Sequence, residues 1–142
     1  DGGACHPRDN IALRFMAQEL DLGYDIFDAI MNAREIQAKN LAKFLVEQAK
    51  LHDLPVLIHG VAYKPGVPYR DGSYSLLVAH YCMKAGYHPI LVDPHTHPQR
   101  GPFTAVALLA HSSDITYKYM DTAHKQELYC HLSEGSIVVD PW

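Results

Sequence analysis

The chain has 142 residues, of which 48% are hydrophobic and 20% are charged, and its net charge is −4. This composition excludes intrinsic disorder, because a chain of this size can bury a hydrophobic core without disulfides or metals. The mild acidity provides no basic stripe, so we expect neither nucleic acid nor a membrane as a partner. The longest apolar run, at 103–110, is shorter than the roughly 18 residues of a membrane helix, which predicts a soluble protein.

Three cysteines without close pairing favour a reducing compartment, and we expect a cytoplasmic location. The chain begins at Asp1 with neither Met nor a signal-peptide pattern, which predicts a piece of a longer protein. Ten histidines raise the question of a metal site. His88, His95 and His97 lie close in sequence, but no carboxylate or cysteine stands at ligand spacing, so we expect no metal.

Two helices are predicted in the first third of the chain. Apolar residues recur at helical spacing from Asn10 to Leu20, and Gly23 ends this helix. The next segment, 25–51, has an apolar stripe and contains neither Gly nor Pro. A helix of about 27 residues would be about 40 Å long, which is typical of a helix that joins two domains or lies in a subunit interface. Two shorter helices broken near Arg34 are the alternative.

A strand, loop, helix and second strand follow. The apolar residues 56–58 predict a buried strand, and a loop rich in Pro and Gly occupies 63–72. Ser73 is the expected N-cap of a helix that continues to residue 85, and 89–92 forms the next strand. This order is a βαβ unit, which is typical of a parallel sheet.

The same alternation continues to the end of the chain, with strands at 104–110 and 137–139 and a helix at 121–132. The sequence therefore predicts an α/β fold: a Rossmann-like parallel sheet flanked by helices, preceded by a helical segment with a long connecting helix. A change in composition at residue 52 divides the chain into a helical part, 1–52, and a Rossmann-like domain, 53–142.

The segment GGACHPRD at 2–9 places glycines, a thiol, an imidazole, a guanidinium and a carboxylate in front of the first helix. Glycine turns and helix N-termini attract negative charge and favour the thiolate form of cysteine. Cys5 is therefore a candidate nucleophile, although a lone cysteine can also be a small buried hydrophobe. Asp9 is either a functional carboxylate or the N-cap of the helix that follows.

These residues resemble the catalytic loop GGxCxPKD of the UDP-glucose/GDP-mannose dehydrogenases, with Arg8 in place of the usual lysine. A second landmark of that family, a strand followed by GxAFKP, is similar to GVAYKP at 60–65. Both motifs occur in the family's order with a long helix between them. The resemblance covers the whole chain and implies the C-terminal part of such an enzyme, with 53–142 as the nucleotide-sugar-binding domain.

The resemblance implies oxidation of a UDP- or GDP-sugar alcohol to the carboxylate in two steps, with NAD as the cofactor. Cys5 would be the nucleophile that forms a thiohemiacetal and then a thioester. Asp9 would orient or deprotonate the hydrolytic water. The expected substrate is a nucleotide sugar, and a homodimer through the long helix is expected because the apolar stripe would otherwise be exposed.

The substrate-binding residues implied by the resemblance are Gly2 and Gly3, which let the backbone approach the sugar, together with Tyr63 and Lys64. The lysine would contact phosphate. A cofactor-binding arginine is expected seven residues after this lysine, where Asp71 stands instead; Arg70, one place earlier, is the substitute.

No GxGxxG fingerprint is present, so we do not expect this sheet itself to bind NAD, and Asp93 is interpreted as a strand-end residue. Two other functions remain open. One is a non-catalytic nucleotide-sugar-binding or dimerisation module. The other is a cysteine hydrolase that uses Cys5 and His6. Cys82 and Cys130 are expected to be inert packing residues in helical segments, and His111 is expected on the surface of a helix or strand.

Overall fold

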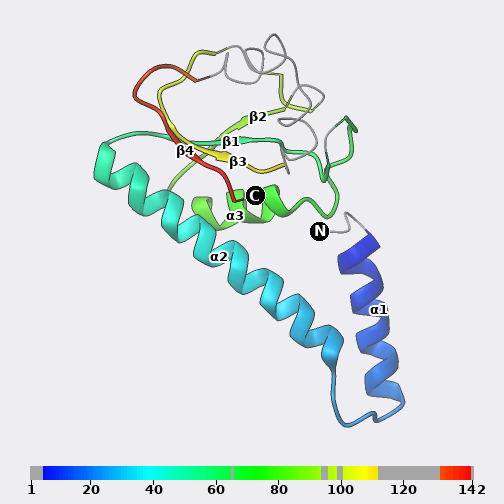
Figure 1. Ribbon diagram of the computed structural model, residues 1–142. Helices are drawn as coiled ribbons and strands as arrows, with labels where there is room; N and C mark the ends of the chain where they lie inside the picture. The colour runs from blue at the N-terminus through cyan, green and yellow to red at the C-terminus, as the bar shows by residue number, and fades with distance from the viewer. Residues whose placement is uncertain (1–4, 65, 94–95, 99–100, 112–131, 142) are drawn as a thin grey trace.

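A computed structural model describes residues 5–64, 66–93, 96–98, 101–111 and 132–141. Two long helices form a hairpin at the N-terminal end, and the first half of the second helix extends away from a small parallel sheet (Figure 1). The elements in chain order are α1 (Cys5–Glu19), α2 (Ile26–His52), β1 (Val56–His59), α3 (Tyr74–Lys84), β2 (Ile90–Val92), β3 (Val106–Leu109) and β4 (Ile137–Val139).

The sheet has the strand order β2-β1-β3-β4, and all of its pairings are parallel. In the register of the central strand, Leu57 lies opposite Ile90 on one side and Ala107 on the other. The predicted α/β class and parallel sheet are therefore confirmed. The helix expected at 121–132 lies outside the described residues, apart from Leu132.

The core lies mainly between one face of the sheet and two helices. Side chains of β1 and β3 alternate between the faces, so that Val56 and Ile58 contact the helices while Leu57 belongs to a second cluster on the opposite face. Burial of these apolar side chains is the main stabilising contribution to the fold. The helical side of the core consists of Ala38, Ala42, Leu45, Val46, Ala49, Val78, Ala79 and Cys82.

The long helix α2 is one uninterrupted element of 27 residues, so the alternative of a break near Arg34 is wrong. Asp25 caps its N-terminus by accepting a hydrogen bond from the backbone N–H of Asp28 at 3.0 Å. Asp53 ends it in the left-handed conformation, with φ 52°. Among the described residues, no helix combines the length and apolarity needed to cross a bilayer.

The second half of α2 packs in the same core as the sheet. The predicted division at residue 52 stays a prediction, and the helix that precedes it contributes directly to the core of the sheet.

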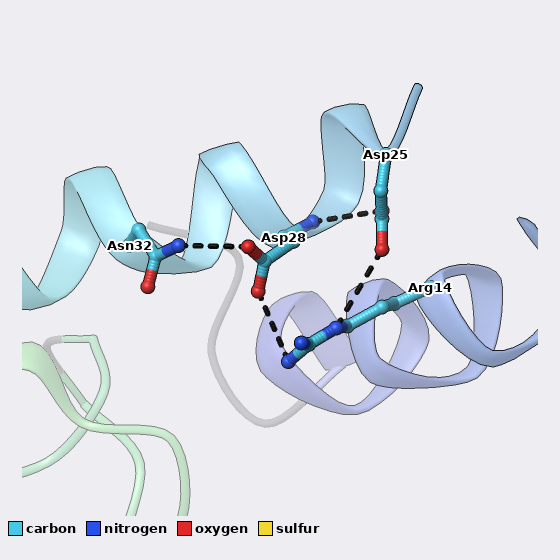
Figure 2. A network of polar contacts seen from close by, with 4 residues as sticks. All are labelled: Arg14, Asp25, Asp28 and Asn32. Atoms are coloured by element: carbon cyan, nitrogen blue, oxygen red, sulfur yellow. Dashed lines mark hydrogen bonds and ion pairs between the residues drawn. The ribbon is translucent and has the colours of Figure 1, made fainter. Parts of the chain in front are cut away.

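A polar network fixes α1 against the beginning of α2 (Figure 2). The Arg14 guanidinium of α1 lies 3.5 Å from Asp25 Oδ2 and 3.0 Å from Asp28 Oδ1, and Asn32 donates a hydrogen bond to Asp28 Oδ2 at 2.9 Å. One arginine therefore joins α1 to both the N-cap and the first turn of α2. This contact joins the middle of α1 to the beginning of the long helix.

Candidate functional site

The carboxyl ends of β1 and β3 mark the place where a ligand is expected. In the strand order β2-β1-β3-β4, the chain leaves β1 toward β2 at one edge of the sheet and leaves β3 toward β4 at the other edge. The loops that follow β1 and β3 therefore diverge. In open parallel sheets, ligands bind at such a switch point, outside the carboxyl ends of the strands. The loop after β1 begins at Gly60 and carries the second motif, while His111 lies just beyond the end of β3.

Gly60 and His111 are in direct contact at this switch point. Gly60 has a φ of 95°, and a Cβ atom added to it would lie 2.7 Å from Nδ1 of His111. The imidazole Nε2 donates a hydrogen bond to the carbonyl oxygen of Ala62 at 2.8 Å. Only glycine fits here, because both the backbone angle and the packed imidazole exclude a side chain. His111, expected on a helix or strand surface, is half-buried just beyond the end of β3 and holds the first turn of the loop.

Asp93 holds the same turn from the opposite side. Its side chain is buried, with 2% of the residue exposed, and Oδ2 accepts hydrogen bonds from the backbone N–H groups of Val61 at 2.9 Å and Ala62 at 3.0 Å. Oδ1 accepts a third from Thr96 at 3.1 Å. A carboxylate that accepts several backbone N–H bonds is well satisfied despite burial. Asp93 does lie at the end of β2, as the sequence predicted. The sequence did not indicate that its carboxylate binds the backbone of the turn after β1.

The anchored turn leads directly to three of the predicted site residues. The Tyr63 N–H donates to the carbonyl of Tyr69 at 3.0 Å and closes the loop on itself. The Lys64 ammonium lies 5.5 Å from the centre of the Tyr63 ring. Lys64 and Arg70 are exposed, and Tyr63 is half-buried. The structure thus places Tyr63, Lys64 and Arg70 on one loop beside the switch point, with both cations accessible.

The far end of this loop is fixed to both helices. Ser73 is the N-cap of α3, as predicted, and its Oγ accepts a hydrogen bond from Leu76 N–H at 3.3 Å. Arg34, in the middle of α2, donates to the carbonyl of Gly72 at 3.1 Å. The sequence interpretation assigned no role to Arg34, because a contact across 38 residues leaves no local signal. The loop is therefore held at its first turn and at its last.

The described part of the first motif, residues 5–9, is helical, because α1 already includes Cys5. Pro7 is compatible with this, since the first turn of a helix has no intrahelical partner for the N–H group that proline lacks. Asp9 lies inside the helix and is not its N-cap. Cys5 and Asp9 stand four residues apart, which places them on one helix face, and both are exposed. Gly2 and Gly3 lie outside the described residues.

Arg8 joins this face of α1. Its Nε lies 2.8 Å from Asp9 Oδ1. The pKa of the Arg8 guanidinium is raised, first by this hydrogen bond, then by the charge of Asp9 and the charge of Cys5. The pair is largely exposed and contributes little to stability. Its effect is to keep a positive charge next to the cysteine and the carboxylate.

The structure bears on two expectations for the cysteines: a hydrolase pair of Cys5 and His6, and an inert packing role for Cys82. Neighbours on a helix do not face each other, and no hydrogen bond between described residues joins Cys5 to His6, which gives no support to a hydrolase pair. Cys82 is fully buried, and burial raises the pKa of its thiol to about 11, as expected for an inert core residue. Cys130 lies outside the described residues.

The sheet does not fit a dinucleotide cofactor. Asp93 stands where a Rossmann domain carries its ribose-binding acid, but its carboxylate is buried and bonded to backbone amides. The turn after β1 also lacks the glycines that admit a pyrophosphate. Within the described ranges, no group of three or more His, Cys, Asp or Glu side chains could hold a metal; His95 is outside them.

No hydrogen bond or ion pair between the described residues joins Cys5 or Asp9 to Tyr63, Lys64 or Arg70. The predicted site residues therefore form two groups, one on α1 and one on the loop after β1. Both groups are held to α2, through Arg14 and Arg34 respectively.

Comparison with known proteins identifies the fold. No protein-family model matches the chain, and no curated protein matches its sequence. The GDP-mannose dehydrogenase of Pseudomonas aeruginosa, solved as a ternary complex, matches 98% of the chain with a TM-score of 0.68 and 18% identity, over 35% of its own length. A UDP-glucose dehydrogenase from the hyperthermophilic archaeon Pyrobaculum islandicum matches 98% with a TM-score of 0.60 and 19% identity, over 34% of its own length.

The chain thus has a fold found in dehydrogenases of nucleotide sugars and spans about a third of the length of either structure. The resemblance predicted from the two motifs is confirmed at the level of the fold. The Rossmann-like α/β architecture, with a long helix in front of the sheet, is shared with both structures.

The anchoring role of Asp93 predicts the effect of Asp93→Asn. This change removes the charge that two loop amides share, and we expect the free energy of unfolding to fall by about 1–3 kcal/mol. Backbone amides of Val61 and Ala62 should exchange faster with solvent. Urea unfolding followed by circular dichroism, together with hydrogen exchange, measures both effects.

The matched control is Asp71→Asn, which removes the same charge from an exposed position of the same loop. It should change stability by less than about 0.5 kcal/mol. Equal stability of the two variants, or unchanged exchange at Val61 and Ala62, would contradict the anchoring role.

Proposed function

We propose that the chain is the part of a nucleotide-sugar dehydrogenase that binds the nucleotide sugar and supplies the catalytic cysteine. The observation that carries the proposal is the position of the second motif. Tyr63 and Lys64 lie on a loop at the switch point of a parallel sheet, where a ligand is expected on topological grounds alone. The fold shared with two dehydrogenases of nucleotide sugars supports the same assignment.

The loop after β1 suits the diphosphate of a UDP- or GDP-sugar. Lys64 is exposed and has no carboxylate partner among the ion pairs of the described residues, so its ammonium is available to phosphate oxygens. Tyr63 orients the lysine through its ring. Because the turn is anchored by Asp93 and His111, little ordering is required when a ligand binds.

The reacting groups of the proposal are on α1. The Cys5 thiolate attacks the aldehyde carbon of the half-oxidised sugar and forms a C–S bond, giving a thiohemiacetal. Loss of hydride from this adduct gives a thioester. Water, deprotonated by Asp9, then attacks the thioester carbon, so that the C–S bond breaks and the carboxylate leaves. Arg8 lies beside Asp9 on the same helix face, with its Nε 2.8 Å from Asp9 Oδ1.

The hydride acceptor in this proposal is NAD. The sheet described above does not fit it, so we assign NAD binding to other parts of the full-length protein, with exposed Arg70 as the contact from this chain. Gly2 and Gly3 belong to the proposed substrate site through their motif. The second candidate function is a non-catalytic nucleotide-sugar-binding module, which is favoured by Asp71 at the position where the family's cofactor arginine is expected.

The enzymatic assignment is tested in the full-length protein with NAD and with UDP-glucose or GDP-mannose, by following NADH. We expect two NADH per sugar oxidised. Cys5→Ala should lower the rate of complete oxidation by about 10³-fold or more, because no covalent adduct forms. Calorimetry should still detect binding of the nucleotide sugar to this variant.

The matched control is Cys82→Ala, which removes a buried thiol of the sheet core and should retain turnover. Complete oxidation by Cys5→Ala would contradict the mechanism. Nucleotide-sugar binding without any NADH formation in the unmodified protein would instead identify the non-catalytic module.

The hairpin of α1 and α2 carries an apolar surface that supports the proposal of a homodimer. Large apolar side chains are more than 45% exposed on both helices, including Phe15 and Met16 on α1 and Ile36 and Phe44 on α2. Patches of this kind are typical of interfaces. The occupant we propose is a second copy of the same hairpin, packed along α2.

Replacement of Ile36 by Glu should convert the dimer to a monomer, because a charge would be buried in the interface. Sedimentation equilibrium on the chain measures this. Val138→Glu is the control, since Val138 is 43% exposed on the edge strand β4 and lies off the hairpin. A monomeric unmodified chain, or an Ile36→Glu dimer as stable as the original, would contradict the proposal.

A further inference from the structure

A second polar site lies between α2 and α3. A groove of about 390 Å³ follows the seam of these helices, which pack side by side (Figure 1). Its charged lining consists of Lys39, Lys43 and Lys50 of α2, Lys84 of α3, and Glu47. The chain as a whole carries a net charge of −4, so this concentration of lysines on one groove is opposite to the average charge of the molecule.

Aromatic rings hold these lysines in position. The ammonium groups of Lys39 and Lys84 lie 5.3 and 5.5 Å from the centre of the same ring, that of Tyr81. The Lys50 ammonium lies 5.5 Å from the centre of the Tyr87 ring. Cation–π contacts of this geometry orient an ammonium while leaving its N–H donors available. Three cations from two helices are thereby directed to one groove.

The charges of the groove are only partly neutralised. Lys43 and Glu47 form an ion pair at 3.8 Å, and the second nearby carboxylate, Glu35, accepts a hydrogen bond from the Tyr81 hydroxyl. The ion pairs of the described residues include none of Lys39, Lys50 and Lys84. The floor is apolar, with Ala42, Val46 and Ala85. These apolar side chains add no negative charge to the groove, so its attraction for an anion comes from the three ammonium groups.

The dimensions and the donors of the groove indicate the class of anion. Single exposed ion pairs contribute at most about 1 kcal/mol, so a ligand with one charge would gain little here. A ligand with several neighbouring charges contacts several lysines at once. Ammonium groups are common partners of phosphate oxygens. A volume of about 390 Å³ is at the small end of ligand sites, too small for a protein segment with a standard interface.

We infer that the groove between α2 and α3 binds a small polyphosphate, held by Lys39, Lys50 and Lys84 and separate from the loop after β1. Linear triphosphate is the simplest ligand of this class. The inference is independent of the proposed dehydrogenase function, because none of the groove residues belongs to either group of predicted site residues.

Titration of the chain with inorganic tripolyphosphate, followed by calorimetry, tests the inference. The double variant Lys39→Gln/Lys84→Gln should weaken binding by about tenfold or more. Glu47→Gln removes a repulsive carboxylate and should tighten binding several-fold. Higher salt should weaken binding of the unmodified chain, because the attraction is electrostatic.

A charge-matched control separates the groove from a general effect of net charge. Glu19→Gln makes the same change in net charge as Glu47→Gln from an exposed position on α1, and should not tighten binding. Binding that is unaffected by Lys39→Gln/Lys84→Gln would overturn the inference, as would equal affinity for an oligoglutamate of the same charge.

Discussion

Leu45 and Ala49 of α2 are buried against the sheet, so a single long helix shares the core of β1 and β3. Because α2 is continuous, its first half is held rigidly with respect to that core. Arg14 attaches α1 to the beginning of the helix, and Arg34 attaches the loop after β1 to its middle. Both groups of candidate site residues therefore depend on the packing of one helix. A break in α2 would separate them without altering either group.

The carboxyl edge of the sheet depends on a smaller set of contacts. Asp93 binds two successive amides of the turn after β1, and His111 binds the carbonyl of the same turn while its ring packs on Gly60. Backbone donors and acceptors of this turn are thus satisfied inside the protein, and the side chains of Tyr63 and Lys64 carry the exposed polar groups of the motif. A turn with this arrangement is anchored on both sides, and the Asp93 carboxylate that a Rossmann domain would use for ribose is occupied by backbone amides.

The sequence allowed much of this fold to be predicted, because the signals are local. The 27-residue helix follows from a stretch without Gly or Pro, the strands from short apolar runs, and the N-cap Ser73 from its position before a helical pattern. The parallel sheet follows from the alternation of strand and helix. The start of α1 was misplaced, since the glycines before Cys5 and the proline after it are typical of a loop, although proline is also tolerated in a first helical turn.

The anchoring residues of the site could not be predicted, because their contacts are long-range. Asp93 reaches backbone amides about thirty residues earlier, and His111 reaches a carbonyl 49 residues earlier. Asp93 had a signal in its position after β2, but the sequence cannot show whether a strand-end acid faces a ligand or its own backbone. The groove between α2 and α3 could not be predicted either. Its lysines lie on two separate helices and come together only when α2 and α3 pack.

The central claim is that the turn after β1 is the nucleotide-sugar site of this chain. Amide chemical shifts of the isotopically labelled chain, recorded during titration with UDP-glucose or GDP-mannose, test it most directly. The account predicts that the largest changes occur at Gly60, Val61 and Ala62 and at Lys64, with saturation at one equivalent. Changes confined to the groove around Lys39 and Lys84, or none in the turn at saturating ligand, would contradict it.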